Sequence, residues 1–296
     1  MDSRVPKETH EPSLSRCLGD KLMTWIATGR RRALSTMLSL LAFLAVTASA
    51  DPSEAVRPFV TDDARIVDKG QLETESFAGL ALIRGQKPAF TLGTLEAMSV
   101  TDRLQITAGG IGLEYHDRGL TAFENLVFQP KFVLYRSFGA IPSVTLAPSL
   151  LMPLSGNRQL WNSFTMAHIS WFLFTPEGSP DPYDNGLAIH LNIGTKSQYN
   201  AGLGGRYTSK VYWAGGFEVI TFTREIRFLG ELFSGDPFIF EDEFPAFQTG
   251  FRWYKTPDVQ WDFVWRGART GSGTEGREVW NNTFQIGLRV LFEVFR

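Results

Sequence analysis

The C-terminal end of the chain alternates between apolar and polar side chains, and this alternation restricts the fold more than any other feature. Every second residue from Phe284 to Val294 is apolar, and the residues between them are mostly polar or small. A period of two places the two kinds of side chain on opposite faces of a β-strand. The run has the length of a tilted strand that crosses a membrane, about 9–11 residues, whereas strands of soluble sheets usually have about 5–6. The pattern therefore predicts a transmembrane strand.

Four earlier segments repeat this alternation: 126–135, 187–194, 247–254 and 259–266. In each of them, one set of positions is bulky and apolar, and the other set is polar, charged or glycine. An outer-membrane barrel turns its apolar side chains to the lipid and its polar side chains to the lumen, whereas a water-soluble barrel places the bulky set inside. We therefore expect an all-β protein, an antiparallel transmembrane β-barrel.

The rest of the pattern predicts about twelve strands. Short connections after the second, fourth, eighth and tenth strands, the eighth being Lys210 alone, are typical of periplasmic turns, and long ones at 225–244 and 270–278 are typical of external loops. Residues 175–185 are long for a periplasmic turn, so counts of ten or fourteen remain open. The expected strands lie near 71–84, 89–100, 103–116, 122–136, 143–154, 164–174, 186–197, 201–209, 211–224, 245–254, 259–269 and 279–295.

Composition excludes several other classes of protein. The net charge of −2 gives no basic face for nucleic acid, and Cys17 is the only cysteine, so neither a disulfide framework nor a cysteine metal site is possible. A mean hydropathy of −0.09 is too low for a bundle of membrane helices. Abundant glycine and aromatic residues agree with an all-β chain that has many turns.

The first fifty residues have the pattern of a secretory signal peptide. Arg30 to Arg32 precede the apolar stretch 38–46, and Ala48-Ser49-Ala50 follows it. We expect cleavage near Ala50, with Met23 as an alternative start; a single membrane anchor is the competing interpretation. The expected organisation is a signal peptide at 1–50, an N-terminal periplasmic segment at 51–70 and a barrel at 71–296 in the outer membrane of a bacterial-type cell.

The start of the mature chain carries a recognisable motif. The sequence RPFVTDDAR begins at Arg57, and KGQLETE begins at Lys69. This start resembles the outer-membrane family called "MetA-pathway of phenol degradation", whose members begin with a T-D-D segment and a G-x-x-E-x-E first strand. The resemblance covers residues 55–296 and implies an outer-membrane channel for aromatic or other small hydrophobic compounds. The motif residues here are Thr61, Asp62, Asp63, Gly70, Glu73 and Glu75.

From the residues alone, the Thr-Asp-Asp run suits a polar segment that caps or enters the barrel, and we expect Glu73 and Glu75 to face the lumen and pair with arginines. The polar face of the strands supplies the candidate pore lining. Both signs of charge occur there, so ion pairs that plug the pore are an alternative to an open filter. The candidates are Gln129, Lys131, His168, His190, Asn192, Glu218, Arg252, Asp262, Arg266, Arg289 and Glu293.

We searched the same face for catalytic groups. His168 and Ser170 share a strand face, which is similar to the His-x-Ser pair of outer-membrane phospholipase A, but the Asn-Gly that follows that serine is missing and the pair is expected in the lumen. His168 and His190 have no evident third ligand for zinc. No catalytic residue, metal or cofactor is therefore expected. The leading hypothesis is passive passage of a small solute; a lipid-acting acyl hydrolase and a closed structural barrel are the alternatives.

The expected partners are outer-membrane lipid, the barrel-assembly machinery and a small-molecule solute, and no nucleic acid. The long segment 225–244 carries an apolar core from Phe233 to Phe240 beside the acidic run Glu241 to Glu243. Because a solvated loop should not expose so much apolar surface, we expect it to fold over or into the outer mouth. The alternative is that its two neighbouring strands extend and pair above the membrane.

Overall fold

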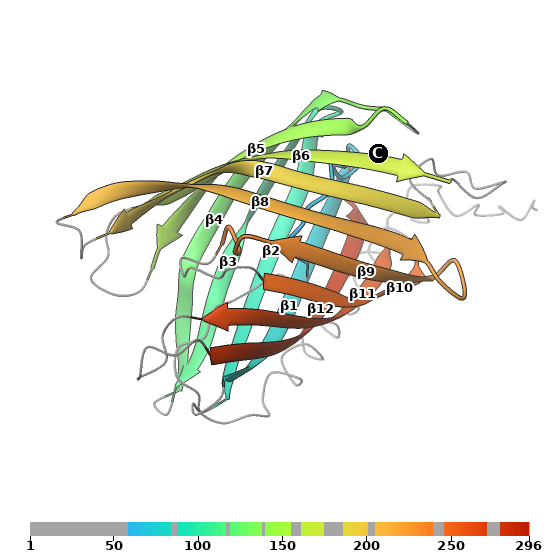
Figure 1. Cartoon of the computed structure of the whole chain (residues 1–296). Coiled ribbons are helices and arrows are strands. Elements are labelled where there is room, and N and C mark those ends of the chain that lie inside the picture. Colours follow the sequence, from blue (N-terminus) through green and yellow to red (C-terminus); the bar gives the residue numbers. More distant parts are fainter. Residues whose placement is uncertain are drawn as a thin grey trace, which may run out of the picture. The chain divides into compact units, whose positions relative to one another are not determined.

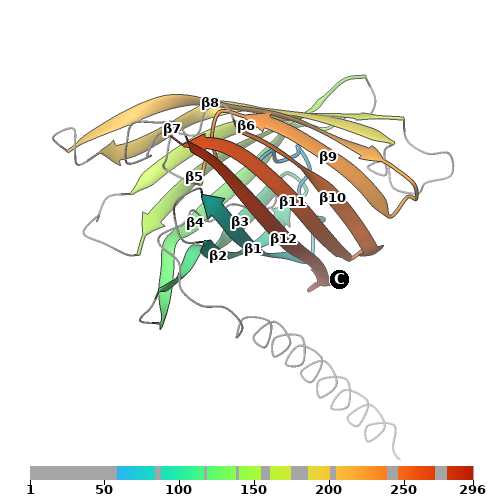
Figure 2. The same cartoon turned by 60° about the horizontal axis from the view of Figure 1, so that its bottom comes forward.

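Twelve strands form one closed antiparallel barrel in the computed structural model (Figures 1 and 2). The structure describes residues 59–83, 88–116, 119–137, 140–154, 161–174, 186–200, 205–238, 246–270 and 279–295, all within the compact unit Ser49–Arg296. The expected signal peptide and the expected cleavage site lie outside these residues. The strands are β1 (Gln71–Ile83), β2 (Ala89–Thr101), β3 (Leu104–His116), β4 (Gly119–Tyr135), β5 (Ser143–Pro153), β6 (Asn162–Leu173), β7 (Leu187–Asn200), β8 (Arg206–Ile220), β9 (Ile226–Phe233), β10 (Ala246–Thr256), β11 (Val259–Thr270) and β12 (Val279–Glu293).

Each strand pairs with its neighbours in the sequence, and β1 closes the barrel by pairing with β12 from Gln71↔Glu293 to Ile83↔Asn281. The predicted fold class and the number of strands are confirmed. We call the end of the barrel that carries the start of β1 and the short turns 102–103, 221–225 and 257–258 the turn end, and the opposite end the loop end. In the part of the chain that the structure describes, no helix is long and apolar enough to cross a membrane.

Two of the predicted strands were wrong. Lys210 is not a turn but lies inside β8, which begins at Arg206 and so takes in the end of the predicted strand 201–209; residues 201–204 lie outside the described residues. The missing strand is β9, which lies in the stretch predicted as a loop, 225–244. The start of β8 is polar on both faces, and the inward face of β9 includes the apolar Leu229 and Phe233. In neither strand do polar and apolar side chains therefore alternate with a period of two.

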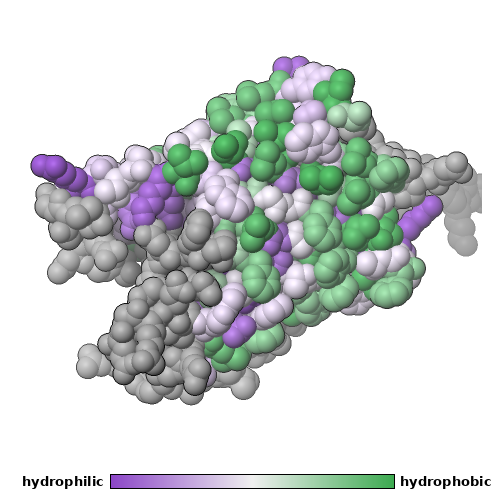
Figure 3. All heavy atoms as spheres, viewed as in Figure 1, coloured by the Kyte–Doolittle hydropathy of each residue, from purple (hydrophilic) through white to green (hydrophobic). Residues whose placement is uncertain are grey.

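The side chains of the barrel are apolar outside and largely polar inside. Along β11, Phe263 and Trp265 are exposed, whereas Asp262 and Arg266 are buried. Figure 3 shows apolar side chains spread over the visible outer face of the strands. This arrangement is inverted relative to a soluble protein and is the arrangement expected for a barrel whose outer surface contacts lipid.

The interior has two layers. Toward the loop end, buried apolar side chains pack together, among them Phe77, Leu151, Phe164 and Phe233. Toward the turn end, the interior is polar and charged. The functional groups therefore concentrate in the half of the lumen near the turns.

The wall is interrupted between β4 and β5. Pairing stops at Phe128↔Leu150 and resumes at Phe132↔Leu146. In this register Pro130 lies opposite Pro148. The amide of Val133 points to the β3 side of β4, and successive amides of a strand point in opposite directions, so the amide at position 130 should point to β5. Positions 130 and 148 are therefore a pair that would normally exchange two backbone hydrogen bonds. Because proline has no N–H group, neither bond of that pair can form.

Candidate functional site

Gly70 reverses the chain at the turn end, directly before β1. Its φ is +87°, a conformation that glycine adopts without strain. The amides of Val294 and Phe295 donate to its carbonyl oxygen at 2.8 and 3.1 Å, and a Cβ at this position would collide with the carbonyl oxygen of Phe295. The reversal lets the residues before β1 run back inside the barrel, where we name residues 59–68 the plug.

The backbone of the plug is held by side chains from three different parts of the wall. The amides of Val60 and Thr61 donate to the carboxylate of Glu231 at 3.0 and 3.1 Å. The amide of Ala64 donates to Ser170 Oγ at 2.8 Å. Contacts to β9 and β6 fix the plug inside the lumen, so this part of the segment expected at 51–70 enters the barrel, as the polar Thr-Asp-Asp run indicated.

A third wall contact lies nearer to β1. The amide of Val67 donates to Gln105 Oε1 at 2.8 Å, and Ser99 Oγ donates to the carbonyl oxygen of Val67. Lys69 then makes an isolated parallel bridge with Ser99. These contacts attach the plug to β2 and β3 before the chain turns at Gly70.

The acidic pair of the plug binds a buried lysine. Lys131 Nζ, on β4, donates to Asp62 Oδ2 at 3.0 Å and to the carbonyl oxygen of Asp63 at 2.7 Å. The carboxylate of Asp63 pairs with Arg65. Burial alone raises the pKa of Asp63, but the positive charges of Arg65 and then Lys131 outweigh it and hold this pKa well below its usual value of 3.8. The carboxylate of Asp63 is therefore charged at neutral pH.

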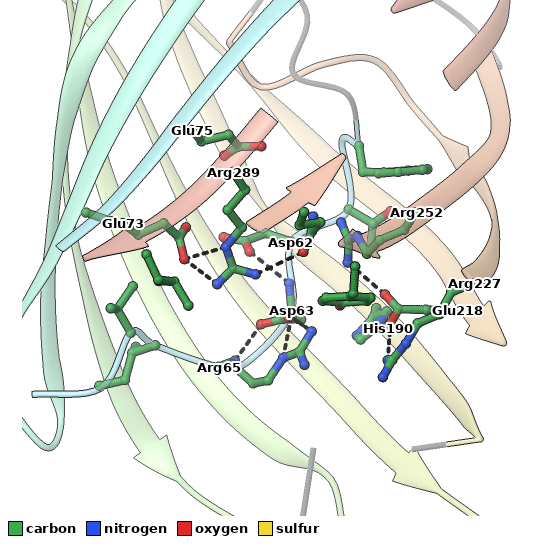
Figure 4. A pocket seen from close by; sticks show the side chains of 18 of the residues that line it. Asp62, Asp63, Arg65, Glu73, Glu75, His190, Glu218, Arg227, Arg252 and Arg289 are labelled. Carbon is green, nitrogen blue, oxygen red and sulfur yellow. Dashed lines mark hydrogen bonds and ion pairs between the residues drawn. The ribbon is translucent and has the colours of Figure 1, made fainter. Parts of the chain in front are cut away.

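A belt of alternating charges runs along the inner wall beside the plug (Figure 4). Glu218 pairs with Arg227 and, at 2.8 Å, with Arg252. Arg252 also contacts Asp262, with 3.0 Å between Nε and Oδ1. Four neighbouring strands, β8 to β11, are thereby linked by side chains as well as by their backbones.

The belt continues across the closing strands. Gln260 Nε2 donates to Asp262 at 3.1 Å, and Arg289 Nη1 donates to Gln260 Oε1 at 3.4 Å. Arg289 then pairs with Glu73 on β1, donating from Nε at 2.6 Å. The expectation that Glu73 meets a lumenal arginine is confirmed. Because these pairs join strands that are adjacent or, for Glu218 and Arg252, separated only by β9, they line the wall and do not themselves cross the lumen.

A cavity of about 900 Å³ adjoins the plug and reaches the turn residues Arg136, Glu225 and Pro257. Plug residues, Lys131 of the wall and residues of the charged belt line it together. Cations and carboxylates of the lining are interspersed. The cavity therefore suits small polar or amphipathic molecules better than a large ion of one sign.

Nearly all of the predicted lining residues lie on the inner face. Those that are buried are Gln129, Lys131, His168, His190, Asn192, Glu218, Asp262 and Arg266. Arg252 and Arg289 also point inward and are partly exposed, and Glu293 is exposed at the end of β12. Glu75 lines the cavity.

Ser170 pairs with a histidine, though not with the one two residues before it. Ser170 Oγ lies 2.9 Å from His190 Nδ1, whereas His168 Nε2 lies 4.0 Å from Asp62 Oδ2. The serine is completely buried inside the barrel, so a lipid acyl chain outside the wall does not meet it. Among the described residues, no group of three His, Cys, Asp or Glu side chains could hold a metal ion.

Sequence reasoning missed Glu231, Arg227 and Gln105 as site residues. The first two lie on β9, which was taken for a loop, so their inward direction could not be deduced. Gln105 does lie on a predicted strand, and its polar position in the alternation is a signal that could have identified it.

Residues 234–238, which follow β9, turn inward at the loop end and narrow it. Asp236 and Phe238 are buried. The expectation that this segment folds into the mouth is met by these described residues, and Phe240 and Glu241 to Glu243 lie outside them. In the alternative, the two neighbouring strands extend and pair above the membrane. Among the described residues, β8 does extend past Phe233, but its partner there is β7, up to Asn200↔Arg206.

Comparisons with known proteins support the fold. No protein-family model and no curated protein matches the sequence. Among solved structures, the NanC porin is similar with a TM-score of 0.50 and 10% identity, over 73% of this chain and 98% of that chain. The COG4313 outer membrane channel from Pseudomonas putida F1 has a TM-score of 0.45 and 11% identity, over 78% and 98%. The CymD monoaromatic hydrocarbon channel has a TM-score of 0.37 and 8% identity, over 78% and 90%. The likeness to the porin shows that this chain has the fold of an outer-membrane β-barrel.

Proposed function

We propose that this chain is an outer-membrane channel for small solutes, including aromatic molecules that carry a polar group, and that its own N-terminal segment closes the lumen in the state described. The observation that carries the proposal is the plug: a polar segment bonded to inward side chains beside a cavity of about 900 Å³. A barrel with only a structural role needs no such cavity. The family resemblance of the Thr61-Asp62-Asp63 start supports the same function.

The contacts of the plug favour a removable closure. Its backbone is bound to side chains of Glu231, Ser170 and Gln105, not to a continuous strand ladder. The charged belt joins wall strands to one another, so its ion pairs remain when the plug leaves, whereas Lys131 loses its pair with Asp62. Water of the adjoining cavity can then solvate the freed groups, which lowers the cost of opening.

Conductance in planar bilayers tests the proposal. A variant without residues 59–66 should conduct more than the full chain, because it loses the backbone anchors to Glu231 and Ser170. A second variant, in which Gly-Ser repeats of equal length replace these residues, keeps the backbone amides but loses the Asp62–Lys131 pair and the buried side chains of Val60 and Ala64, so it should also conduct more. Retained heat-modifiable mobility on gels shows that the barrel is still folded. Folded variants that remain closed would identify a structural barrel instead. Acyl release by purified protein that disappears in Ser170→Ala would favour the enzyme.

A further inference from the structure

The segment 234–238 places a carboxylate and an aromatic ring, two residues apart, inside the loop end of the barrel. Asp236 Oδ2 lies 3.5 Å from Arg266 Nη1, and both side chains are 1% exposed. Lys196 Nζ donates to the backbone oxygen of Asp236 at 3.1 Å. The wall thus supplies two cations to this residue: Arg266 of β11 to its carboxylate and Lys196 of β7 to its backbone.

The ring of Phe238 fills an apolar site next to these cations. Its centroid lies 5.0 Å from that of Phe164, edge to face, and Met166 and Tyr212 belong to the same buried cluster. The amide of Phe238 donates to Asp236 Oδ1 at 2.8 Å, which fixes the ring relative to the carboxylate. Strand residues form the site, and a connecting segment fills it.

We propose that Asp236 and Phe238 occupy a binding site for a small aromatic carboxylate, and that this solute widens the loop end by displacing them. The inference rests on the proposed channel function and names the solute class that it would admit. When the segment leaves, Arg266 loses a carboxylate partner in a buried position, which is unfavourable unless another anion replaces it. A neutral aromatic molecule can fill the ring site but cannot replace that charge.

The exchange explains why a carboxylate should be preferred. A carboxylate accepts charge-assisted hydrogen bonds from arginine and lysine, and an aromatic ring packs edge to face against Phe164. Both interactions of the segment are reproduced by one solute, so its binding shifts the segment from the inward to the displaced position. A solute can shift such an equilibrium only through a difference in its affinity for the two positions.

Calorimetric titration of the purified full chain tests this site, with phenylacetate as the probe and phenylacetamide as its neutral counterpart. Asp236→Asn removes the competing charge but keeps an acceptor for the Phe238 amide. We expect this variant to bind phenylacetate at least tenfold more tightly than the unmodified protein, and phenylacetamide with unchanged affinity. Adding Arg266→Gln should abolish the gain. Asp102→Asn, which makes the same change on the exposed turn 102–103 outside the cavity lining, is the matched control and should leave both affinities unchanged.

Three results would overturn the site: equal phenylacetate affinity with and without Asp236, an equal gain for the amide, or no binding in any folded variant. Conductance of the protein without residues 59–66 is measured in parallel. If that protein conducts while Asp236→Asn gains no affinity, the carboxylate site is refuted and the channel stands. If it does not conduct, the channel itself is refuted, and the inference with it.

Discussion

Replacing Glu231 by alanine should release the plug. The Glu231 carboxylate accepts the amides of Val60 and Thr61, at 3.0 and 3.1 Å, and also Gln248 Nε2 at 2.8 Å. Only the first two bonds join the plug to the wall. A hydrogen bond contributes about 0.5–1.5 kcal/mol to stability, and the upper value applies here because the acceptor is a buried carboxyl group. Two bonds then amount to about 3 kcal/mol, which is roughly a 100-fold change in the open-to-closed ratio.

Single-channel recording measures that ratio directly. Glu231→Gln keeps an acceptor of similar shape without the charge, so its open-to-closed ratio should lie between those of the unmodified protein and the alanine variant. Glu73→Ala is the control, since it removes a carboxylate from the same cavity whose ion-pair partner is Arg289 of the wall. If Glu73→Ala opens the channel as much as Glu231→Ala, the effect comes from the lost charge in the lumen, and the anchoring role of Glu231 is refuted.

Three further predictions concern the membrane face, pH and the turn. Ile286→Arg places a charge on the lipid side in the middle of β12, opposite Phe263 and Ala78, and should cost about 2–4 kcal/mol. Leu291→Arg faces the cavity and should be milder; folded yield in lipid measures both, and equal damage would contradict the assigned faces. The pKa of Asp63 is lowered in the folded protein, so its charge contributes fully to plug binding at any pH above the ordinary carboxyl pKa of 3.8. This contribution is lost only when the pH falls through the lowered pKa of the folded state. The open-to-closed ratio should therefore not respond to Asp63 between neutral pH and about pH 4, and a rise in this range that Asp63→Asn abolishes would disprove the argument. Gly70→Ala should reduce the stability of the turn by about 1–2 kcal/mol, because alanine is strained at the positive φ of this residue, and should raise the open fraction. Gly205→Ala is strained in the same way at the β7–β8 hairpin and should destabilise the barrel without opening it.

Alternation was sufficient to predict the fold wherever the two faces meet different surroundings. In β12, lipid outside and the charged interior inside keep Phe284 and Gln285 on opposite faces. The signal failed in β9, because the interior at the loop end is itself apolar around Leu229 and Phe233. A strand with apolar residues on both faces looks like any other hydrophobic segment when only the sequence is read.

The sequence predicted which residues face the lumen but not which of them bind one another. Inward direction follows from the strand period, so Lys131 and Arg252 could be assigned to the lumen. Their partners depend on how neighbouring strands are shifted and on where the plug runs, and neither follows from a local pattern. The acidic pair Asp62-Asp63 indicated a polar segment, but only the structure shows that Lys131 binds it.

The two opposed prolines give the barrel a mechanically weak line. A closed sheet has no edge at which to begin opening, so its resistance to separation is set by the pair of strands with the fewest bonds. Between Phe128 and Phe132 the backbone of β4 is not paired with β5, and the side-chain bond from Gln129 to Ser149, 2.7 Å long, lies across that gap. Under denaturant or mechanical load, separation of the wall should therefore begin between β4 and β5, and the amides of Phe128 and Phe132 should exchange their protons faster than those in the continuous ladder of β11 and β12.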